Sequence, residues 1–134
     1  MDAPVRIVFV CVENSDRSQM AEAFARMYGA DNVEAYSAGS RPSGRVNPQA
    51  VAAMAELGYD LTKHVSKAFD HLPPGPFDVV VMMGCGDRCP NLNAVWREDW
   101  EIPDPRDMPP AEFRQVRDLI GEKVKLLLAA MPDS

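Results

Sequence analysis

The sequence predicts an α/β fold with a four-stranded parallel sheet flanked by helices. Short apolar runs that fit buried strands alternate along the chain with segments whose apolar residues recur at helical spacing. The first run ends at a cysteine and turns at once into a helical pattern, which is typical of a strand–loop–helix unit. We expect residues 1–134 to form a single domain, because 134 residues are enough for one core.

The first half of the chain contains two predicted strands and one predicted helix. Residues 5–10 (VRIVFV) form an apolar run bounded by a turn, as in a strand buried on both faces. Residues 18–29 have their apolar side chains on one helical face and end at a glycine. Residues 33–39 (VEAYSAG) fit a second strand. Strand, helix and strand in this order predict a parallel pair.

The second half repeats the alternation. Residues 47–57 begin with an Asn-Pro pair that suits a helix start, and Gly58 follows them. Residues 77–83 (FDVVVMM) fit a third buried strand, and residues 93–102 contain a less regular fourth one. From Pro109 onward, apolar residues recur every three or four positions, which predicts a long amphipathic helix.

Composition and charge restrict the class of protein. A net charge of −6 argues against a nucleic-acid or polybasic membrane surface. The N-terminus lacks a signal-peptide pattern, so we expect a cytoplasmic protein. We separately expect a monomer. Thiols stay reduced in the cytoplasm, so three cysteines suggest reactive or metal-binding thiols and not a structural framework.

The loop from Cys11 to Ser18 suits an oxyanion. A loop between a buried strand and a helix start turns backbone N–H groups inward, and the helix dipole adds to their effect. A cysteine there is stabilised as a thiolate, and the planar guanidinium of Arg17 suits a tetrahedral anion. The alternative is that Cys11 is a small buried hydrophobe and Arg17 a surface charge. The flanking strand, the helix and Ser18 favour a nucleophile aimed at a bound anion.

Residues 11–24 (CVENSDRSQMAEAF) resemble the phosphate-binding loop of the low-molecular-weight protein tyrosine phosphatase fold, and within it the arsenate reductases. The resemblance continues through SAGSRPSGRVNPQAV, ELGYDLTKHVSKAF and MGCGDRCPN to DWEIPDP, over nearly the whole chain. It implies that Cys11 is the nucleophile, that Arg17 clamps the oxyanion, and that Asn14 and Ser18 shape the loop and stabilise the thiolate. It also implies that the loop binds the substrate through Val12, Glu13, Asn14, Ser15, Asp16, Arg17 and Ser18.

Two loop residues depart from the family pattern. Family members often have cysteine or a small residue where Asp16 stands, and glycine where Glu13 stands. Acidic side chains inside the loop would repel an anion by several kcal/mol at low dielectric. We therefore expect both side chains to point out to solvent, leaving only backbone N–H groups facing the substrate.

An Asp-Pro pair follows the fourth predicted strand. In the phosphatase branch, Asp104 with Pro105 resembles the general acid that protonates the leaving oxygen. The alternative is a turn aspartate held by a rigid proline. Asp107 is a weaker candidate for the acid. Trp100 is interpreted as a core or rim residue that also forms one wall of the pocket.

Cys85 and Cys89 separate a reductase from a phosphatase, because reducing arsenate needs two electrons from thiols. In the implied relay they attack in turn after Cys11 has bound arsenic, and thioredoxin or a small thiol then reduces the resulting disulfide. The order of the two cysteines stays open. In thioredoxin-linked relatives the resolving pair is seven residues apart, and Met82 stands at the first of those positions. Two packed thiols or half a metal site are the alternatives.

Some family members bind potassium, and the matching positions are Asn14, Glu22, Ser37 and Lys67. A lysine in this set would repel the cation and could replace its charge, so we expect no bound potassium. We expect no bound metal or other cofactor either. His64 and His71 are interpreted as surface or capping residues.

These observations favour a cytoplasmic arsenate reductase for arsenic detoxification, with residual phosphatase activity. The first alternative is a phosphatase for phosphotyrosine or small phosphate esters that uses Cys11, Arg17 and Asp104. An aromatic pocket mouth would favour it, and Cys85 and Cys89 would be dispensable. The second alternative is a non-enzymatic oxyanion-binding domain.

Overall fold

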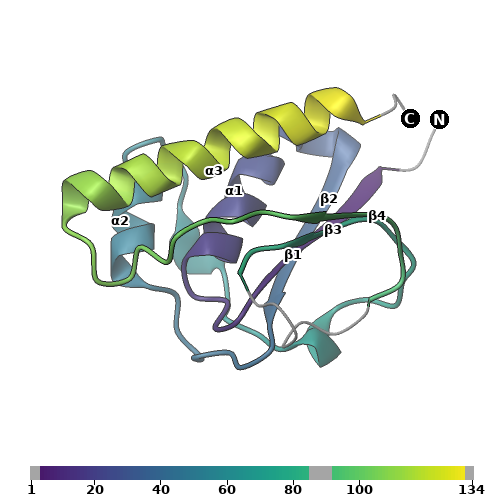
Figure 1. Cartoon of the computed structure of the whole chain (residues 1–134), viewed down its shortest axis with the longest axis horizontal. Coiled ribbons are helices and arrows are strands. Elements are labelled where there is room, and N and C mark those ends of the chain that lie inside the picture. The colour runs from purple at the N-terminus through teal and green to yellow at the C-terminus, as the bar shows by residue number, and fades with distance from the viewer. Residues whose placement is uncertain (1–3, 85–91, 132–134) are drawn as a thin grey trace.

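The structure is a computed structural model that describes residues 4–84 and 92–131 (Figure 1). Its centre is a parallel sheet in which the first strand pairs with both the second and the third. The strands lie in the order β2-β1-β3-β4. Their bounds are β1 (Val5–Cys11), β2 (Val33–Gly39), β3 (Phe77–Met82) and β4 (Ala94–Asp99). The predicted four-stranded parallel sheet is confirmed.

The predicted helices are confirmed as well. They are α1 (Arg17–Gly29), α2 (Pro48–Ala55) and α3 (Pro110–Ala130), with short 3₁₀ turns η1 (Ala30–Asn32), η2 (Leu61–Lys63) and η3 (Phe69–His71). Helices α1 and α3 pack against each other on one face of the sheet, and α2 contacts both (Figure 1). The larger core lies between these helices and the sheet, and includes Ile7, Phe9, Phe24 and Ile120.

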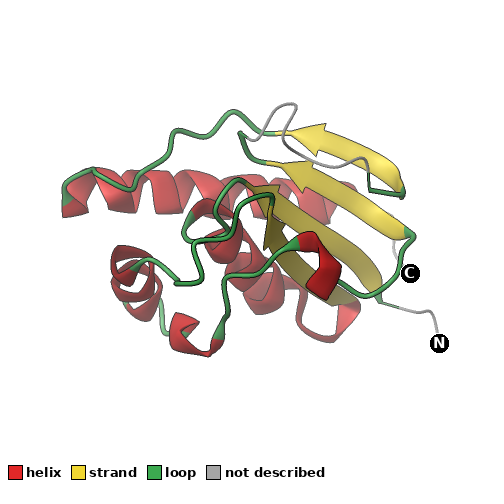
Figure 2. Ribbon diagram, turned by 90° about the horizontal axis from the view of Figure 1, so that it is seen from below, coloured by secondary structure: helices red, strands yellow, loops and turns green. Residues whose placement is uncertain are grey.

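The opposite face of the sheet is also buried, but by different means. Val8 and Val10 of β1 pack there with Phe77 and Val80 of β3. Phe69 and Leu72, from the segment that contains η3, cover this smaller core (Figure 2). The continuous apolar pattern of β1 therefore predicted burial on both faces correctly, although a 3₁₀ turn and not an α-helix covers the second face.

The carboxyl ends of the strands meet at one edge, as in other parallel sheets. Cys11 at the end of β1 pairs with Gly39 at the end of β2. A Cβ atom on Gly39 would lie 2.5 Å from the carbonyl oxygen of Val12, so only glycine lets the loop after β1 cross here. The loops that follow the strands thus converge on Cys11. Within the part of the chain that the structure describes, no helix is long and apolar enough to span a membrane.

Candidate active site

The loop between β1 and α1 has its backbone carbonyls turned outward. Four of these carbonyls accept hydrogen bonds from backbone N–H groups of residues 40–47. The pairs are Cys11 with Ser40 at 3.3 Å, Val12 with Arg41 at 2.7 Å, Glu13 with Ser43 at 3.1 Å, and Ser15 with Asn47 at 2.9 Å. Since a peptide N–H points away from its C=O, this anchoring turns N–H groups toward the loop interior. The loop is therefore shaped to receive an anion.

Asn14 fixes the shape of this loop. Its φ of 52° lies in the left-handed region, which asparagine tolerates better than most residues. The side chain is fully buried, and its Oδ1 accepts hydrogen bonds from the backbone N–H of Lys67 and from Gln19 Nε2, both at 2.9 Å. Its Nδ2 donates to Ser18 Oγ at 2.8 Å. Asn14 thus ties the loop to the start of α1 and to the segment after η2.

The Cys11 thiol lies at the base of the loop and is 2% exposed. Its Sγ is 2.8 Å from Ser18 Oγ, and the backbone N–H of Asn14 donates to it at 3.3 Å. Because Ser18 Oγ already accepts a hydrogen bond from Asn14, its own proton is free to point at the sulfur. Two hydrogen-bond donors, near the start of α1, therefore point at the Cys11 sulfur.

Arg17 extends along one side of the same pocket. Its Nη1 donates to the carbonyl of Ile102 at 3.1 Å, and its Nη2 lies 3.9 Å from Asp104 Oδ2. Gly84 (φ +88°) leaves room for it, since a Cβ atom there would lie 2.6 Å from Nη1. Its Nε is buried and has no hydrogen-bond partner among residues 4–84 and 92–131. This donor is available to a bound oxyanion.

The pocket above Cys11 has a volume of about 250 Å³. Its lining consists of Cys11, Val12, Glu13, Ser15, Asp16, Arg17, Gly84, Asp104 and Arg106. No aromatic residue belongs to this described lining, and polar or charged side chains predominate. Such a pocket suits a small anion better than an aryl group.

Asp104 and Arg106 stand at the mouth of the pocket. Asp104 Oδ1 accepts a hydrogen bond from the backbone N–H of Arg106 at 3.1 Å, while its Oδ2 lies 3.8 Å from Arg106 Nη2. The Asp104 side chain is 36% exposed, so it can exchange protons with water. Arg106 also pairs with the carboxylate of Glu13. Asp104 is therefore placed to protonate an oxygen that leaves toward solvent.

The prediction that Glu13 and Asp16 both point to solvent is wrong for Asp16. Its residue is only 4% exposed and lines the pocket. The Glu13 side chain is 34% exposed and is neutralised by Arg106. Burial, together with the nearby Asp104 carboxylate, raises the pKa of Asp16 from 3.8 to about 6. Two acids of the loop thus line the pocket: Glu13, which is paired with Arg106, and Asp16, which is buried.

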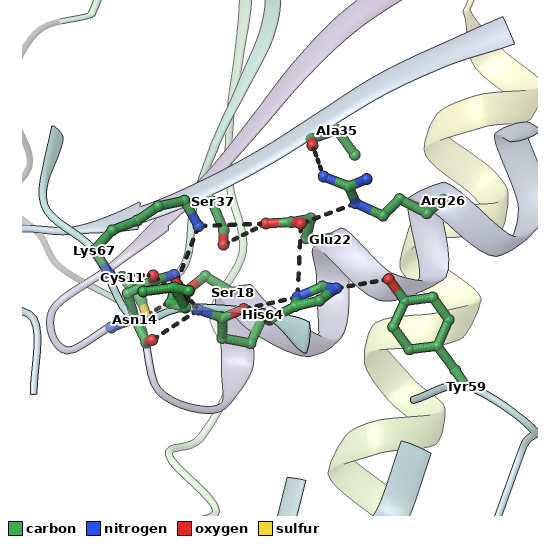
Figure 3. A network of polar contacts seen from close by, with 12 residues as sticks. Cys11, Asn14, Ser18, Glu22, Arg26, Ala35, Ser37, Tyr59, His64 and Lys67 are labelled. Atoms are coloured by element: carbon green, nitrogen blue, oxygen red, sulfur yellow. Dashed lines mark hydrogen bonds and ion pairs between the residues drawn. The ribbon is translucent and has the colours of Figure 1, made fainter. Parts of the chain in front are cut away.

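A polar network lies behind the loop and centres on the buried carboxylate of Glu22 (Figure 3). Ser37 Oγ donates to Glu22 Oε1 at 2.7 Å, and Lys67 Nζ lies 3.8 Å from the same oxygen. Arg26 Nε donates to Oε2 at 2.9 Å. Together with the contact between Lys67 and Asn14, the structure thus brings together the four positions predicted from the potassium-binding relatives.

His64 belongs to this network and is not a surface residue, contrary to the prediction. Its side chain is 6% exposed, and its Nδ1 lies 2.9 Å from Gln19 Oε1 and 3.6 Å from Glu22 Oε2. Its Nε2 lies 2.6 Å from the hydroxyl of Tyr59. Burial lowers the pKa of His64, although Glu22 opposes this effect. His71 does lie at the surface, with a side chain 66% exposed.

Comparisons with known proteins agree with this geometry. The sequence profile described as low molecular weight phosphotyrosine protein phosphatase matches residues 6–134. The chain belongs to this phosphatase family. A glutaredoxin arsenate reductase from Synechocystis is 38% identical over 130 residues, which are 92% of this chain and 96% of that protein.

Solved structures of the phosphatase family show the same fold. An arsenate reductase in its phosphate-binding state superposes with a TM-score of 0.84 at 36% identity, over 96% of this chain and 99% of that one. A thioredoxin-dependent arsenate reductase from Corynebacterium glutamicum has a TM-score of 0.78 at 29% identity, over 97% of this chain and 63% of that one. The phosphatase-like fold therefore also holds arsenate reductases.

Most family positions predicted from the sequence converge on one pocket. Cys11, Arg17 and Asp104 line it together, whereas Asp107 is absent from its described lining. Trp100 is absent as well, so the prediction that it forms a wall is wrong. The Trp100 ring packs on Phe9 in the core instead.

The predictions for Cys85 and Cys89 lie outside the described residues, and the adjoining Gly84 lines the pocket. Within the described parts of the chain, no group of three or more His, Cys, Asp or Glu side chains is arranged to hold a metal ion. The expected absence of a cofactor stays a prediction.

Sequence reasoning missed two residues that shape this family site. Arg106 links the loop to Asp104 through its ion pair with Glu13. Gln19 is fully buried, and its Nε2 donates to the carbonyl and the side chain of Asn14 and to the carbonyl of Val65. A polar residue on the buried face of a predicted helix was the available signal for Gln19.

Proposed function

We propose that this chain is an arsenate reductase that uses Cys11 as its nucleophile. The observation that supports this best is the pocket itself. It holds a thiol that accepts two hydrogen bonds at the base of an N–H-lined loop, beside a guanidinium whose Nε is free for an oxyanion. The relatives named as arsenate reductases share this fold over most of their length.

The first chemical step forms a bond between sulfur and arsenic. Arsenate binds to the loop N–H groups and to Arg17, and the Cys11 thiolate attacks arsenic. One As–O bond breaks, and its oxygen leaves as water after protonation by Asp104. Arg17 balances the charge that builds up on the remaining oxygens. We also assign anion binding to four further residues because they line the pocket: Val12, Glu13, Ser15 and Asp16.

The next steps transfer two electrons from thiols to arsenic. A second thiolate attacks Cys11 Sγ and forms an S–S bond while the S–As bond breaks. The electron pair of the S–As bond stays on arsenic, which leaves as arsenite. A third thiolate then attacks this disulfide and releases Cys11. We assign these roles to Cys85 and Cys89. Support comes from their sequence positions one and five residues after Gly84, which lines the pocket.

An external dithiol must then reduce the disulfide of Cys85 and Cys89. We propose thioredoxin in a cytoplasmic setting, since the C. glutamicum neighbour is thioredoxin-dependent. The Synechocystis relative is named for glutaredoxin instead. Both reductants therefore belong in the test, together with a small thiol.

Coupled turnover tests this function. Arsenate is supplied with NADPH and either thioredoxin with its reductase or glutaredoxin with glutathione and glutathione reductase, and NADPH oxidation is followed. We expect arsenate-dependent oxidation that Cys11→Ser, Cys85→Ser and Cys89→Ser each abolish. Full turnover by Cys89→Ser would contradict the relay. Absence of arsenate-dependent oxidation with both systems and with a small thiol would contradict the reductase.

A phosphatase remains the second candidate, because Cys11, Arg17 and Asp104 would serve phosphate ester cleavage equally well. The described pocket lining has no aromatic side chain, which favours the reductase. Hydrolysis of an aryl phosphate distinguishes the two. We expect it to be slow and to persist in Cys89→Ser. Fast hydrolysis without arsenate-dependent NADPH oxidation would favour the phosphatase.

A further inference from the structure

Asp16 is the most buried of the three carboxylates that line the pocket, and it lacks the contact with Arg106 that Glu13 and Asp104 make. We propose that Asp16 is a specificity-determining residue that accepts a hydrogen bond from an oxyanion carrying a proton, such as arsenate or phosphate, and excludes sulfate, which carries none. The inference rests on the proposed function in assuming that a tetrahedral oxyanion occupies the pocket.

The Asp16 carboxylate is held in one orientation. Its Oδ1 accepts a hydrogen bond from the backbone N–H of Arg17 at 2.6 Å and lies 3.9 Å from Arg17 Nε. Its Oδ2 lies 3.5 Å from Asn47 Nδ2, which comes from the segment that anchors the loop. Asp16 therefore stands beside the unpaired Nε of Arg17. An anion that binds this donor must lie next to the carboxylate.

The charged groups around Asp16 come from three directions. Cys11 and Glu13 belong to its own loop, and Glu13 is paired with Arg106. Arg17 is the first residue of α1. Asp104, also near Arg17, faces Asp16 from the loop after β4 and adds negative charge. No cation pairs with Asp16 alone, because Arg17 also lies near Asp104 and would contact the substrate. The Asp16 carboxylate therefore keeps its capacity to accept a hydrogen bond from a ligand.

An ionised carboxylate can only accept hydrogen bonds, and the oxygens of sulfate can likewise only accept them. Sulfate next to Asp16 would therefore meet repulsion without a compensating hydrogen bond. Phosphate and arsenate retain at least one O–H near neutral pH, and this hydrogen can point at Asp16. A site that accepts a hydrogen bond from a ligand O–H discriminates against an analogue that lacks it, because the analogue brings a second negative charge to the carboxylate without a hydrogen bond.

This discrimination depends on pH. With a pKa raised to about 6 by burial and by Asp104, Asp16 is ionised at pH 8 and protonated at pH 5. A protonated Asp16 is a donor and admits sulfate. Selectivity for phosphate over sulfate should therefore be high above the pKa of Asp16 and should fall below it.

The test measures binding of inorganic phosphate and of sulfate to the full chain by calorimetry, at about pH 8 and about pH 5. For the natural chain, the ratio of the sulfate Kd to the phosphate Kd should fall at least about tenfold between these pH values. Asp16→Asn keeps an oxygen acceptor for the Arg17 N–H and adds a donor. Its ratio at about pH 8 should be at least about tenfold lower than that of the natural chain.

Asp16→Asn also corrects for the ionisation of phosphate, because phosphate changes its protonation in the same way with the variant. Asp70→Asn is the matched control, since it removes a carboxylate that is 83% exposed and absent from the described pocket lining, and it should leave the selectivity within about twofold of the natural chain. If Asp16→Asn fails to fold, Asp16→Ser replaces it at both pH values, because a serine hydroxyl also offers an oxygen acceptor to the Arg17 N–H.

The outcomes separate the two proposals. Binding of phosphate and sulfate with similar affinity at about pH 8 would overturn the role of Asp16 but leave the reductase intact. Unchanged selectivity in Asp16→Asn would do the same. Failure of both anions to bind would contradict the proposed function as well as this inference.

Discussion

At the scale of single residues, Asp16 links the pocket to the stability of the fold. Burial and Asp104 raise its pKa from 3.8 to about 6, so the folded chain holds this proton more tightly than the unfolded chain. The unfolding free energy should therefore fall as pH rises from the unfolded pKa through the folded one, by at most about 3 kcal/mol from this group. Ionised Asp16 thus lowers the stability of the folded chain at neutral pH, which is consistent with a functional role for this residue.

Asp16→Asn should remove this dependence. Relative to the natural chain, we expect the variant to gain about 1–3 kcal/mol between about pH 4 and about pH 7, because the natural chain alone loses stability there. Urea unfolding of both proteins at the two pH values measures the difference. Glu13→Gln should show no such gain, since it loses the ion pair with Arg106 at neutral pH. A pH-independent difference for Asp16→Asn would show that Asp16 titrates alike in both states.

Arg17 contributes to binding through its geometry as well as through its charge. The Ile102 carbonyl fixes Nη1, and this leaves Nε aimed at the anion. Arg17→Lys keeps the charge but loses the planar donor set, so kcat/KM for arsenate should fall about a hundredfold or more. Steady-state kinetics of the coupled assay measure this loss. Arg114→Lys, at an exposed ion pair with Glu56, should leave kcat/KM unchanged. A loss below about tenfold would assign Arg17 a charge role only.

At the scale of elements, the segment after η2 supports the phosphate-binding loop from behind. The backbone N–H of Lys67 holds Asn14, and its ammonium lies 3.8 Å from the buried Glu22 carboxylate. Burial lowers the pKa of Lys67, and Glu22 opposes this effect by favouring the charged form. The lysine side chain thus places a cation beside the buried Glu22 carboxylate, in line with the expectation that Lys67 replaces the charge of a potassium ion.

Lys67→Met should therefore destabilise the fold by about 1–3 kcal/mol, because Glu22 loses one of its compensating charges. Lys63→Met, at an exposed lysine of η2 that loses only a contact of its ammonium with the Tyr59 ring, should change stability by no more than about 1 kcal/mol. Thermal unfolding in KCl and in NaCl at equal ionic strength gives a second readout. The natural chain should unfold at the same temperature in both salts, whereas Lys67→Asp should be more stable in KCl. A potassium-dependent natural chain would show that Lys67 does not replace the ion.

The β1–loop–α1 unit was predictable because its signals are local. An apolar run, a cysteine at its end and a polar helix start lie within a few residues of each other. The direction of the Asp16 side chain had no such signal, because it depends on Asn47 and on Asp104. Arg106 was missed for the same reason: it meets Glu13 across 93 positions of sequence. Sequence patterns therefore predict which loop forms the site, whereas tertiary contacts determine which side chains point into the pocket.

At the scale of the whole molecule, the pocket and the larger core lie in different parts of the fold. The carboxyl edge of the sheet holds the residues that we propose bind the anion, whereas α3 runs across the helical layer and contributes to the larger core (Figure 1). Substitutions in α3 should therefore change the stability of the molecule without changing the affinity of the pocket. Two positions of α3 allow a matched comparison: Ile120 is fully buried, and Leu126 is 69% exposed.

Ile120→Ala should lower the unfolding free energy by about 2–5 kcal/mol, because it removes buried methyl groups and leaves a cavity between α3 and the sheet. Leu126→Ala, on the exposed side of the same helix, should change it by no more than about 0.5 kcal/mol. Urea unfolding measures both. The phosphate Kd of each variant, determined by calorimetry at a temperature where the protein is folded, should stay within about twofold of the natural value. A phosphate Kd that weakens in Ile120→Ala, but not in Leu126→Ala, would instead show that packing of α3 positions the start of α1 and with it the Cys11 loop.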